Sequence, residues 1–175
     1  MYNPVEMQGR FFVLNSFFRS YYLMDGLDKL CGVYDASSKE ESTFTHIHNV
    51  MLCDTIISWC KLFGNDTEEC HWKNLVTDHA DFRKHLFSDL GISAKKFRDY
   101  QLQVLDFRNK WVVHYEPSYN HDIIPLFEHM FASALCLHNY LREQVGNDYG
   151  GPECMEDFGS KVVESLVQRL KEPHT

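Results

Sequence analysis

The sequence has no excess of basic residues, and it lacks several motifs that define large enzyme classes. Its 175 residues include 17 Lys or Arg against 25 Asp or Glu, for a formal net charge of −8. Proteins that coat nucleic acid nonspecifically use many Lys and Arg to neutralise phosphates, so this charge argues against that class and limits any nucleic-acid contact to a local patch. The chain also lacks a GxxxxGK phosphate loop, a dinucleotide-binding glycine fingerprint and a nucleophile elbow, which removes the enzymes that depend on them.

The cysteines form no Cys-x-x-Cys pair, so neither a zinc ribbon nor a redox motif is indicated. Most are expected to be reduced, buried and unreactive; they are Cys31, Cys53, Cys60, Cys70, Cys136 and Cys154. No apolar stretch is long enough to span a membrane. The first ten residues lack the basic start, apolar run and cleavage site of a secretory signal. We therefore expect a cytoplasmic protein with no membrane partner and no cofactor.

What the sequence does contain is enough apolar material for one packed core. Hydrophobic residues make up 44% of the chain and aromatic residues 14%, while the mean hydropathy of −0.37 indicates a polar surface. A chain of this length is long enough to bury a single core and short for two. A single domain over residues 1–175 is expected.

Hydrophobic residues recur at the three- and four-residue spacing of amphipathic helices, and no strand pattern or internal repeat interrupts them. The sequence therefore predicts an all-α fold, a helical bundle of four long helices with a short helical insert and a C-terminal helix. The expected helices cover about residues 5–34, 46–61, two short pieces within 71–90, 94–115, 123–145, and a terminal segment around 162–170. Polar or glycine-containing connections are expected at 35–39, 64–67, 119–122 and 147–152.

Capping residues predict where several helices begin and end. Asp78 separates the two short helices, Gly91 closes the second, and Ser93 can cap the start of the helix that follows. Pro117 disfavours helical geometry in the residue before it. His114 is therefore expected in the last turn of the helix over 94–115.

Arg108 and His114, near the end of that helix, are the candidate catalytic pair. Six residues in an α-helix correspond to a rise of about 9 Å and an angular separation of about 120°. Trp111 is three residues from each, so the two side chains are expected to flank it at the edges of one apolar face. If this face packs against a second copy, the pairs meet in a shared cleft, which predicts a homodimer. Upstream, the face continues with Phe97, Tyr100, Val104 and Phe107.

These residue types suit cleavage of RNA without a metal. A histidine can act as general base toward a ribose 2′-hydroxyl or as general acid toward the leaving oxygen. An arginine stays charged, and its planar donors match a phosphoryl group. Asn109 is the candidate accessory residue, able to bond a phosphate oxygen or to hold the histidine. Between residues 93 and 117 five basic residues face three acidic ones, and Lys110 is the candidate RNA contact beside the pair.

The string from Phe107 to His114, Phe-Arg-Asn-Lys-Trp-Val-Val-His, resembles the signature of the HEPN superfamily. In that signature an arginine, a polar residue, a short spacer and a histidine close one central helix. A broader similarity over about residues 40–145 includes the segment 54–64 and the short helical insert, which resemble the abortive-infection toxin branch. The resemblance implies a metal-independent endoribonuclease with this catalytic pair, a homodimer with the site at its interface, and a toxin or antiphage effector held in check by a nucleotidyltransferase antitoxin.

Other interpretations of the same residues stay open. Arg108 can simply lie along the bundle surface, and His114 can be a helix-terminal cation favoured by the helix dipole. Some HEPN domains lack nuclease activity, so a noncatalytic dimerisation or binding module is the alternative function. Ten histidines also allow an unrelated metal-binding bundle, but no set such as His-Glu-x-x-His is present. The candidate ligands would be His46, His48, Asp54, Asp81 and His85.

Overall fold

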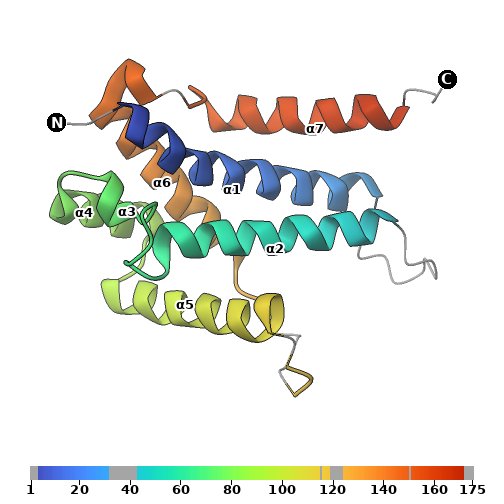
Figure 1. Ribbon diagram of the computed structural model, residues 1–175, viewed down its shortest axis with the longest axis horizontal. Coiled ribbons are helices and arrows are strands. Elements are labelled where there is room, and N and C mark those ends of the chain that lie inside the picture. The colour runs from blue at the N-terminus through green and yellow to red at the C-terminus, as the bar shows by residue number, and fades with distance from the viewer. Residues whose placement is uncertain (1–3, 32–42, 115, 119–123, 150, 172–175) are drawn as a thin grey trace.

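The computed structural model describes residues 4–31, 43–114, 116–118, 124–149 and 151–171, and this part of the chain is helical with no strand (Figure 1). The all-α prediction is confirmed. The elements are α1 (Pro4–Cys31), α2 (Thr43–Phe63), α3 (Trp72–Leu75), α4 (His79–Leu90), α5 (Ala94–Phe107), η1 (Arg108–Val113), α6 (Phe127–Val145), η2 (Gly146–Tyr149) and α7 (Met155–Lys171).

Helices α7, α1, α2 and α5 lie in a row, each beside the next, as Figure 1 shows from top to bottom. Helix α1 packs along α2 on one side and α7 on the other, while α2 contacts α5 and η1. Helix α6 crosses behind this row, where it contacts α1, α2 and the short helix α4. The insert α3–α4 therefore lies at one end of the row, next to the start of α5.

The core between these helices is rich in aromatic side chains. Trp59 on α2 is fully buried and stacks on Phe63, with ring centroids 5.4 Å apart. Its indole nitrogen donates a hydrogen bond of 2.8 Å to Ser133 Oγ on α6, which is also fully buried. A buried polar atom that lacks such a partner is costly. This bond therefore ties α2 to α6 at the centre of the core.

The helix ends predicted from capping residues are confirmed. Asp78 accepts hydrogen bonds from the backbone N–H groups of the first turn of α4. Gly91 ends that helix in the left-handed conformation, at φ 62°, which glycine adopts without steric cost. Ser93 Oγ accepts a bond of 3.3 Å from Lys96 N and caps α5. Local side-chain chemistry thus determines where α4 begins and ends and where α5 begins.

Two predicted helix ranges are wrong at one end. The helix over 94–115 is α-helical only as far as Phe107 and continues as the π-helix η1. Val112 and Val113 are β-branched and weaken α-helical preference at this point. The next helix begins at Phe127, not near 123, because Pro125 has no backbone N–H and restricts the residue before it. The connections expected at 35–39 and 119–122 lie outside the described residues.

None of the helices in the described segments is long and apolar enough to cross a membrane.

Candidate functional site

The predicted catalytic segment forms a π-helix rather than the end of an α-helix. The backbone N–H of His114 bonds to the carbonyl of Asn109 at 2.9 Å, an interval of five residues. Residues five apart consequently lie one above the other on η1, in place of the three- and four-residue neighbours of an α-helix. The expected positions on either side of Trp111 follow from α-helical spacing, which η1 does not have, and the wider turn sets His114 over Asn109. Single π turns are frequent at functional sites.

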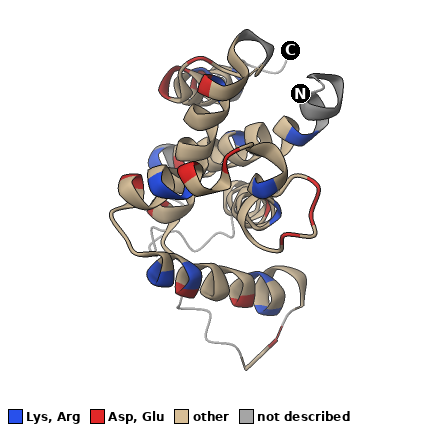
Figure 2. Cartoon of the chain, turned by 90° about the vertical axis from the view of Figure 1, so that its left-hand side faces the viewer, with Lys and Arg blue, Asp and Glu red and all other residues tan. Residues whose placement is uncertain are grey.

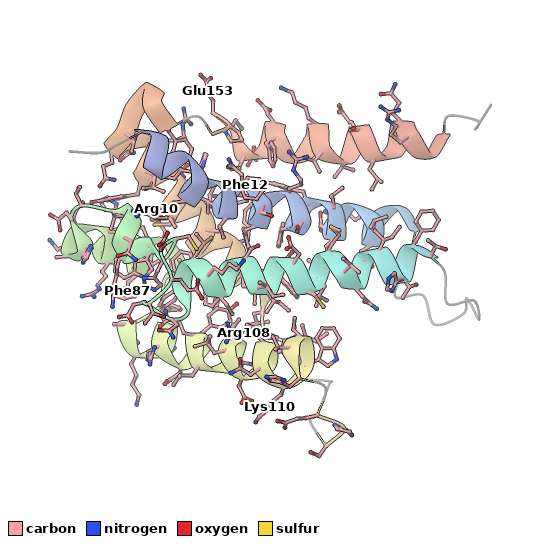
Figure 3. The ribbon with its side chains drawn as sticks, viewed as in Figure 1. Arg10, Phe12, Phe87, Arg108, Lys110 and Glu153 are labelled. Carbon is pink, nitrogen blue, oxygen red and sulfur yellow. The ribbon has the colours of Figure 1, made fainter. Side chains whose placement is uncertain are left out.

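Arg108 and Asn109 are joined directly by their side chains. The guanidinium of Arg108 donates two hydrogen bonds to Asn109 Oδ1, at 3.1 Å from Nε and 2.7 Å from the terminal nitrogen. Arg108 is half-buried on the side of the helix that faces α2, and Asn109 is exposed (Figure 3). The amide oxygen of Asn109 therefore orients the arginine, and its NH2 group stays available to a ligand.

The side chain of His114 does not join this pair. Its side chain is exposed, and within the described segments no hydrogen bond joins it to Arg108 or Asn109. Trp111 is half-buried and packs on Phe107, with ring centroids 5.0 Å apart. The backbone places the histidine one turn above Asn109, on the solvent side of η1.

The apolar face that sequence reasoning offered to a second copy is covered within the chain. Phe97 and Tyr100 are buried, and their ring centroids lie 6.4 and 5.5 Å from that of Trp59 on α2. Val104 and Phe107 are also buried. The proposed packing of this face against a symmetry mate is therefore wrong, because α2 already occupies it.

Arg108 and Asn109 line a cavity of about 520 Å³ between α5 with the start of η1, the loop after α2 and the insert α3–α4. Four basic side chains line the cavity, against the carboxylate of Asp66. They are Lys73, Arg83, Arg98 and Arg108. Basic residues lie toward both ends of α5, the lowest helix in Figure 2. The cavity is thus locally cationic in an acidic chain.

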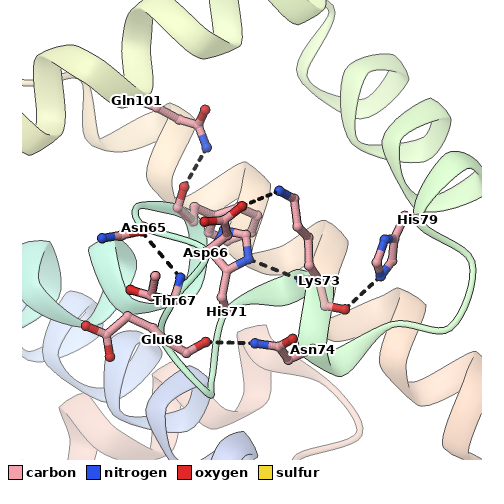
Figure 4. A network of polar contacts seen from close by, with 10 residues as sticks. Asn65, Asp66, Thr67, Glu68, His71, Lys73, Asn74, His79 and Gln101 are labelled. Carbon is pink, nitrogen blue, oxygen red and sulfur yellow. Dashed lines mark hydrogen bonds and ion pairs between the residues drawn. The ribbon is translucent and has the colours of Figure 1, made fainter.

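A polar network on the loop after α2 and on α3 contributes Asp66, His71 and Lys73 to the wall of the cavity (Figure 4). Lys73 Nζ lies 2.8 Å from Asp66, and this hydrogen bond lowers the pKa of the aspartate. His71 caps α3, because its Nδ1 accepts a bond of 3.3 Å from Lys73 N. Burial, helped by the charge of Lys73, lowers the pKa of His71 to about 4. The imidazole is therefore neutral at pH 7, with its proton on Nε2.

The arginines of the cavity are not engaged in ion pairs. Within the described part of the chain, Arg83, Arg98 and Arg108 have no carboxylate within salt-bridge distance. The guanidinium of Arg83 lies over the ring of Trp72, 5.5 Å from its centroid. A cation held on an aromatic face keeps its outward donors for a ligand.

Lys110, the predicted RNA contact, lies away from this cavity. Its ammonium is 2.9 Å from Asp106 one turn earlier on the same helix, and Figure 3 shows it on the side of the helix opposite Arg108. Sequence reasoning did not select Lys73 or Arg83, which come from the insert. No local signal marks them, since only the fold of the insert against α5 brings them near Arg108.

The candidate metal ligands do not converge. In the described segments no group of three or more His, Cys, Asp or Glu side chains could hold a metal ion. Asp81 and His85 lie 3.6 Å apart on α4 as an exposed pair one turn apart. The tyrosine hydroxyl of Tyr140 also donates to that aspartate, at 3.1 Å.

No family model, curated protein or solved structure matches this chain.

Proposed function

We propose that this chain is a HEPN-type, metal-independent endoribonuclease that acts as a toxin or antiphage effector. The observation that carries the proposal is the orientation of Arg108 by Asn109 at the edge of a cationic cavity. A preoriented guanidinium next to a concave basic surface suits the charge that develops on a phosphoryl group during cleavage. The arrangement as a bundle of four long helices with a short helical insert and a C-terminal helix is part of the same proposal.

In the proposed reaction His114 removes the proton of the ribose 2′-hydroxyl. The 2′ oxygen then forms a bond to phosphorus, and the bond from phosphorus to the 5′ oxygen breaks. That oxygen takes a proton from water, and the hydroxide left behind takes the proton held by His114, which leaves a 2′,3′-cyclic phosphate, a 5′-hydroxyl end and a neutral histidine. Arg108 stabilises the extra negative charge on the phosphoryl oxygens, and the NH2 group of Asn109 donates to one of them.

A homodimer remains part of the proposal, at a surface other than the buried face of α5. Val113 is 55% exposed and His114 beside it is exposed, so the end of η1 is the surface on which we propose that a second copy docks. RNA is the proposed substrate, a nucleotidyltransferase antitoxin the proposed regulator, and the cytoplasm the proposed location.

A noncatalytic binding module is the second candidate, and the position of His114 favours it. The histidine does not line the cavity that holds Arg108. A module of this kind would use the cavity for binding without a general base. The two candidates differ in whether removal of the imidazole abolishes a reaction.

The test is cleavage of a broad RNA panel in EDTA by the wild-type protein, Arg108→Gln and His114→Ala. Each variant is expected to reduce the cleavage rate by at least about 100-fold, the usual effect of losing a general base or an oriented charge. His46→Ala removes an exposed histidine on α2 and should cleave like wild type. Circular dichroism and thermal unfolding confirm that each variant is folded.

Mixing the two inactive variants tests the role of a second copy. If each site combines Arg108 of one chain with His114 of another, a mixture of Arg108→Gln and His114→Ala regains activity because mixed dimers contain one intact site. No regain means that each site is built within one chain. An inactive wild type, or full activity in folded His114→Ala, would remove the nuclease proposal and leave the binding module.

A further inference from the structure

The cavity beside Arg108 gathers positive charge that its surroundings do not neutralise. Arg83 comes from α4, Arg98 from α5 and Arg108 from η1, and all three line the same space. The described residues supply no carboxylate partner to any of them, although acidic residues outnumber basic ones by 25 to 17. The carboxylate of Asp66 on the wall is already bonded to Lys73. Guanidinium groups on a concave surface without acidic partners form an anion-binding site.

The site is longer than one phosphate group. Arg98 and Arg108 are ten residues apart along α5 and η1, which corresponds to about 15 Å along a helix axis. Successive phosphates of one strand in a stacked helix are about 3.4 Å apart along its axis, so the backbone positions of the two arginines are separated by the length of several nucleotides. Arg83 lines the same cavity from α4 and would contribute a third contact.

The cavity also offers aromatic surface next to its charges. Phe87 on α4 is half-buried, lines the cavity and packs against Phe97 with ring centroids 6.0 Å apart. Figure 3 shows it where α4 approaches the start of α5. Proteins that hold single strands combine a basic groove with aromatic rings on which bases stack. A base that is paired in a duplex is already stacked between its neighbours. It therefore cannot enter a cavity of about 520 Å³ and stack on a protein ring there.

We propose that Arg83, Arg98 and Phe87 form a subsite that binds the phosphates and one base of a single-stranded RNA. The subsite holds nucleotides next to the one whose phosphate contacts Arg108. Because Arg83 and Phe87 belong to the helical insert, the insert thereby positions the substrate. The assignment of the bound strand as substrate rests on the proposed ribonuclease function. The phosphate and base contacts do not depend on it.

The experiment measures binding of fluorescein-labelled 2′-O-methyl hexauridylate and hexaadenylate by fluorescence anisotropy, in EDTA and at several salt concentrations. The wild-type protein is expected to bind at least one of them. Arg83→Gln and Arg98→Gln should each weaken binding by about tenfold, the usual loss for a charge-assisted hydrogen bond. Each should also lower the slope of log affinity against log salt by about 0.7, the value for one phosphate of a single strand.

Matched controls lie beside both arginines. Lys84 on α4 and Lys95 on α5 are exposed and do not line the cavity, so Lys84→Gln and Lys95→Gln should change affinity by less than about twofold. Arg83→Lys keeps the charge and should lose less affinity than Arg83→Gln. This comparison distinguishes the loss of a charge from a disturbance of the fold. Phe87→Leu should weaken binding and leave the salt slope unchanged.

Three results would overturn the inference. One is a wild-type protein that binds neither oligonucleotide; another is an equal loss of affinity in the arginine and lysine variants. The third is competition by uridine 3′-monophosphate at the same concentration as the hexamer, which would assign the cavity to a single free nucleotide. The 2′-O-methyl strand cannot be cleaved, so binding is measured independently of His114. Intact binding without RNA cleavage contradicts the nuclease proposal alone, and cleavage unaffected by Arg83→Gln contradicts the subsite alone.

Discussion

Acid is expected to destabilise the folded chain through His71, on the wall of the cavity. The imidazole is 2% exposed, and its Nδ1 accepts the hydrogen bond from Lys73 N that caps α3. Burial and the nearby lysine charge lower its pKa from 6.5 to about 4. A proton on Nδ1 would remove the acceptor and break the cap. The folded state therefore resists the proton that the unfolded chain takes up readily.

The sign and size of the change in the free energy of unfolding follow from this difference between the folded and unfolded pKa of His71. Between pH 6.5 and pH 4 the unfolded state binds more protons than the folded state, so stability falls as the pH falls through this window. At pH 5 the pH is 1.5 units below the pKa of the imidazole in the unfolded chain, whereas the imidazole in the folded chain is still neutral. At about 1.36 kcal/mol per unit, His71 then lowers the free energy of unfolding by about 2 kcal/mol relative to pH 7.

His71→Asn isolates this effect. Asparagine is a good N-cap, so its side-chain oxygen can accept the same backbone bond without titrating. Urea unfolding of both proteins at pH 7, 6 and 5 is the assay. The loss of packing volume lowers the stability of the variant by the same amount at every pH, so only the difference in pH dependence between the two proteins counts. The wild type should lose about 2 kcal/mol more than the variant between pH 7 and 5. Parallel curves would refute the argument.

Three further predictions concern the core and the C-terminal helix. Ser133→Ala leaves the buried indole N–H of Trp59 without an acceptor and should lower the free energy of unfolding by about 1–3 kcal/mol; an unchanged urea midpoint would contradict this. In Gly159→Ala the new Cβ would lie 2.3 Å from the ring of Tyr22, so faster hydrogen exchange in α7 is expected despite the better helix propensity of alanine. Cys154 is exposed and should react with a thiol reagent in the folded protein, whereas the buried thiols should react only after unfolding.

Much of the helical fold could be predicted because its signals are local. Asp78, Gly91 and Ser93 act on backbone groups within a few residues of themselves, so the sequence alone places the ends of α4 and the start of α5. The π-helix at Arg108–Val113 could not be predicted in this way. π-helices are rare and occur mostly as single turns within α-helices, so the three- and four-residue spacing of apolar residues does not indicate one.

The candidate site likewise combines contacts that are local in sequence with contacts that depend on the tertiary structure. Arg108 and Asn109 are adjacent in sequence, and their contact is local. The sequence by itself thus determined the all-α class and the capped insert, but it did not predict that Asn109 orients Arg108; the role expected of Asn109 was to bond a phosphate oxygen or to hold the histidine. Only the tertiary structure decided that α2 covers the apolar face of α5 and that Arg83 of the insert joins Arg98 and Arg108 around one cavity. Side chains distant in sequence meet only through packing of whole helices, which no short motif encodes.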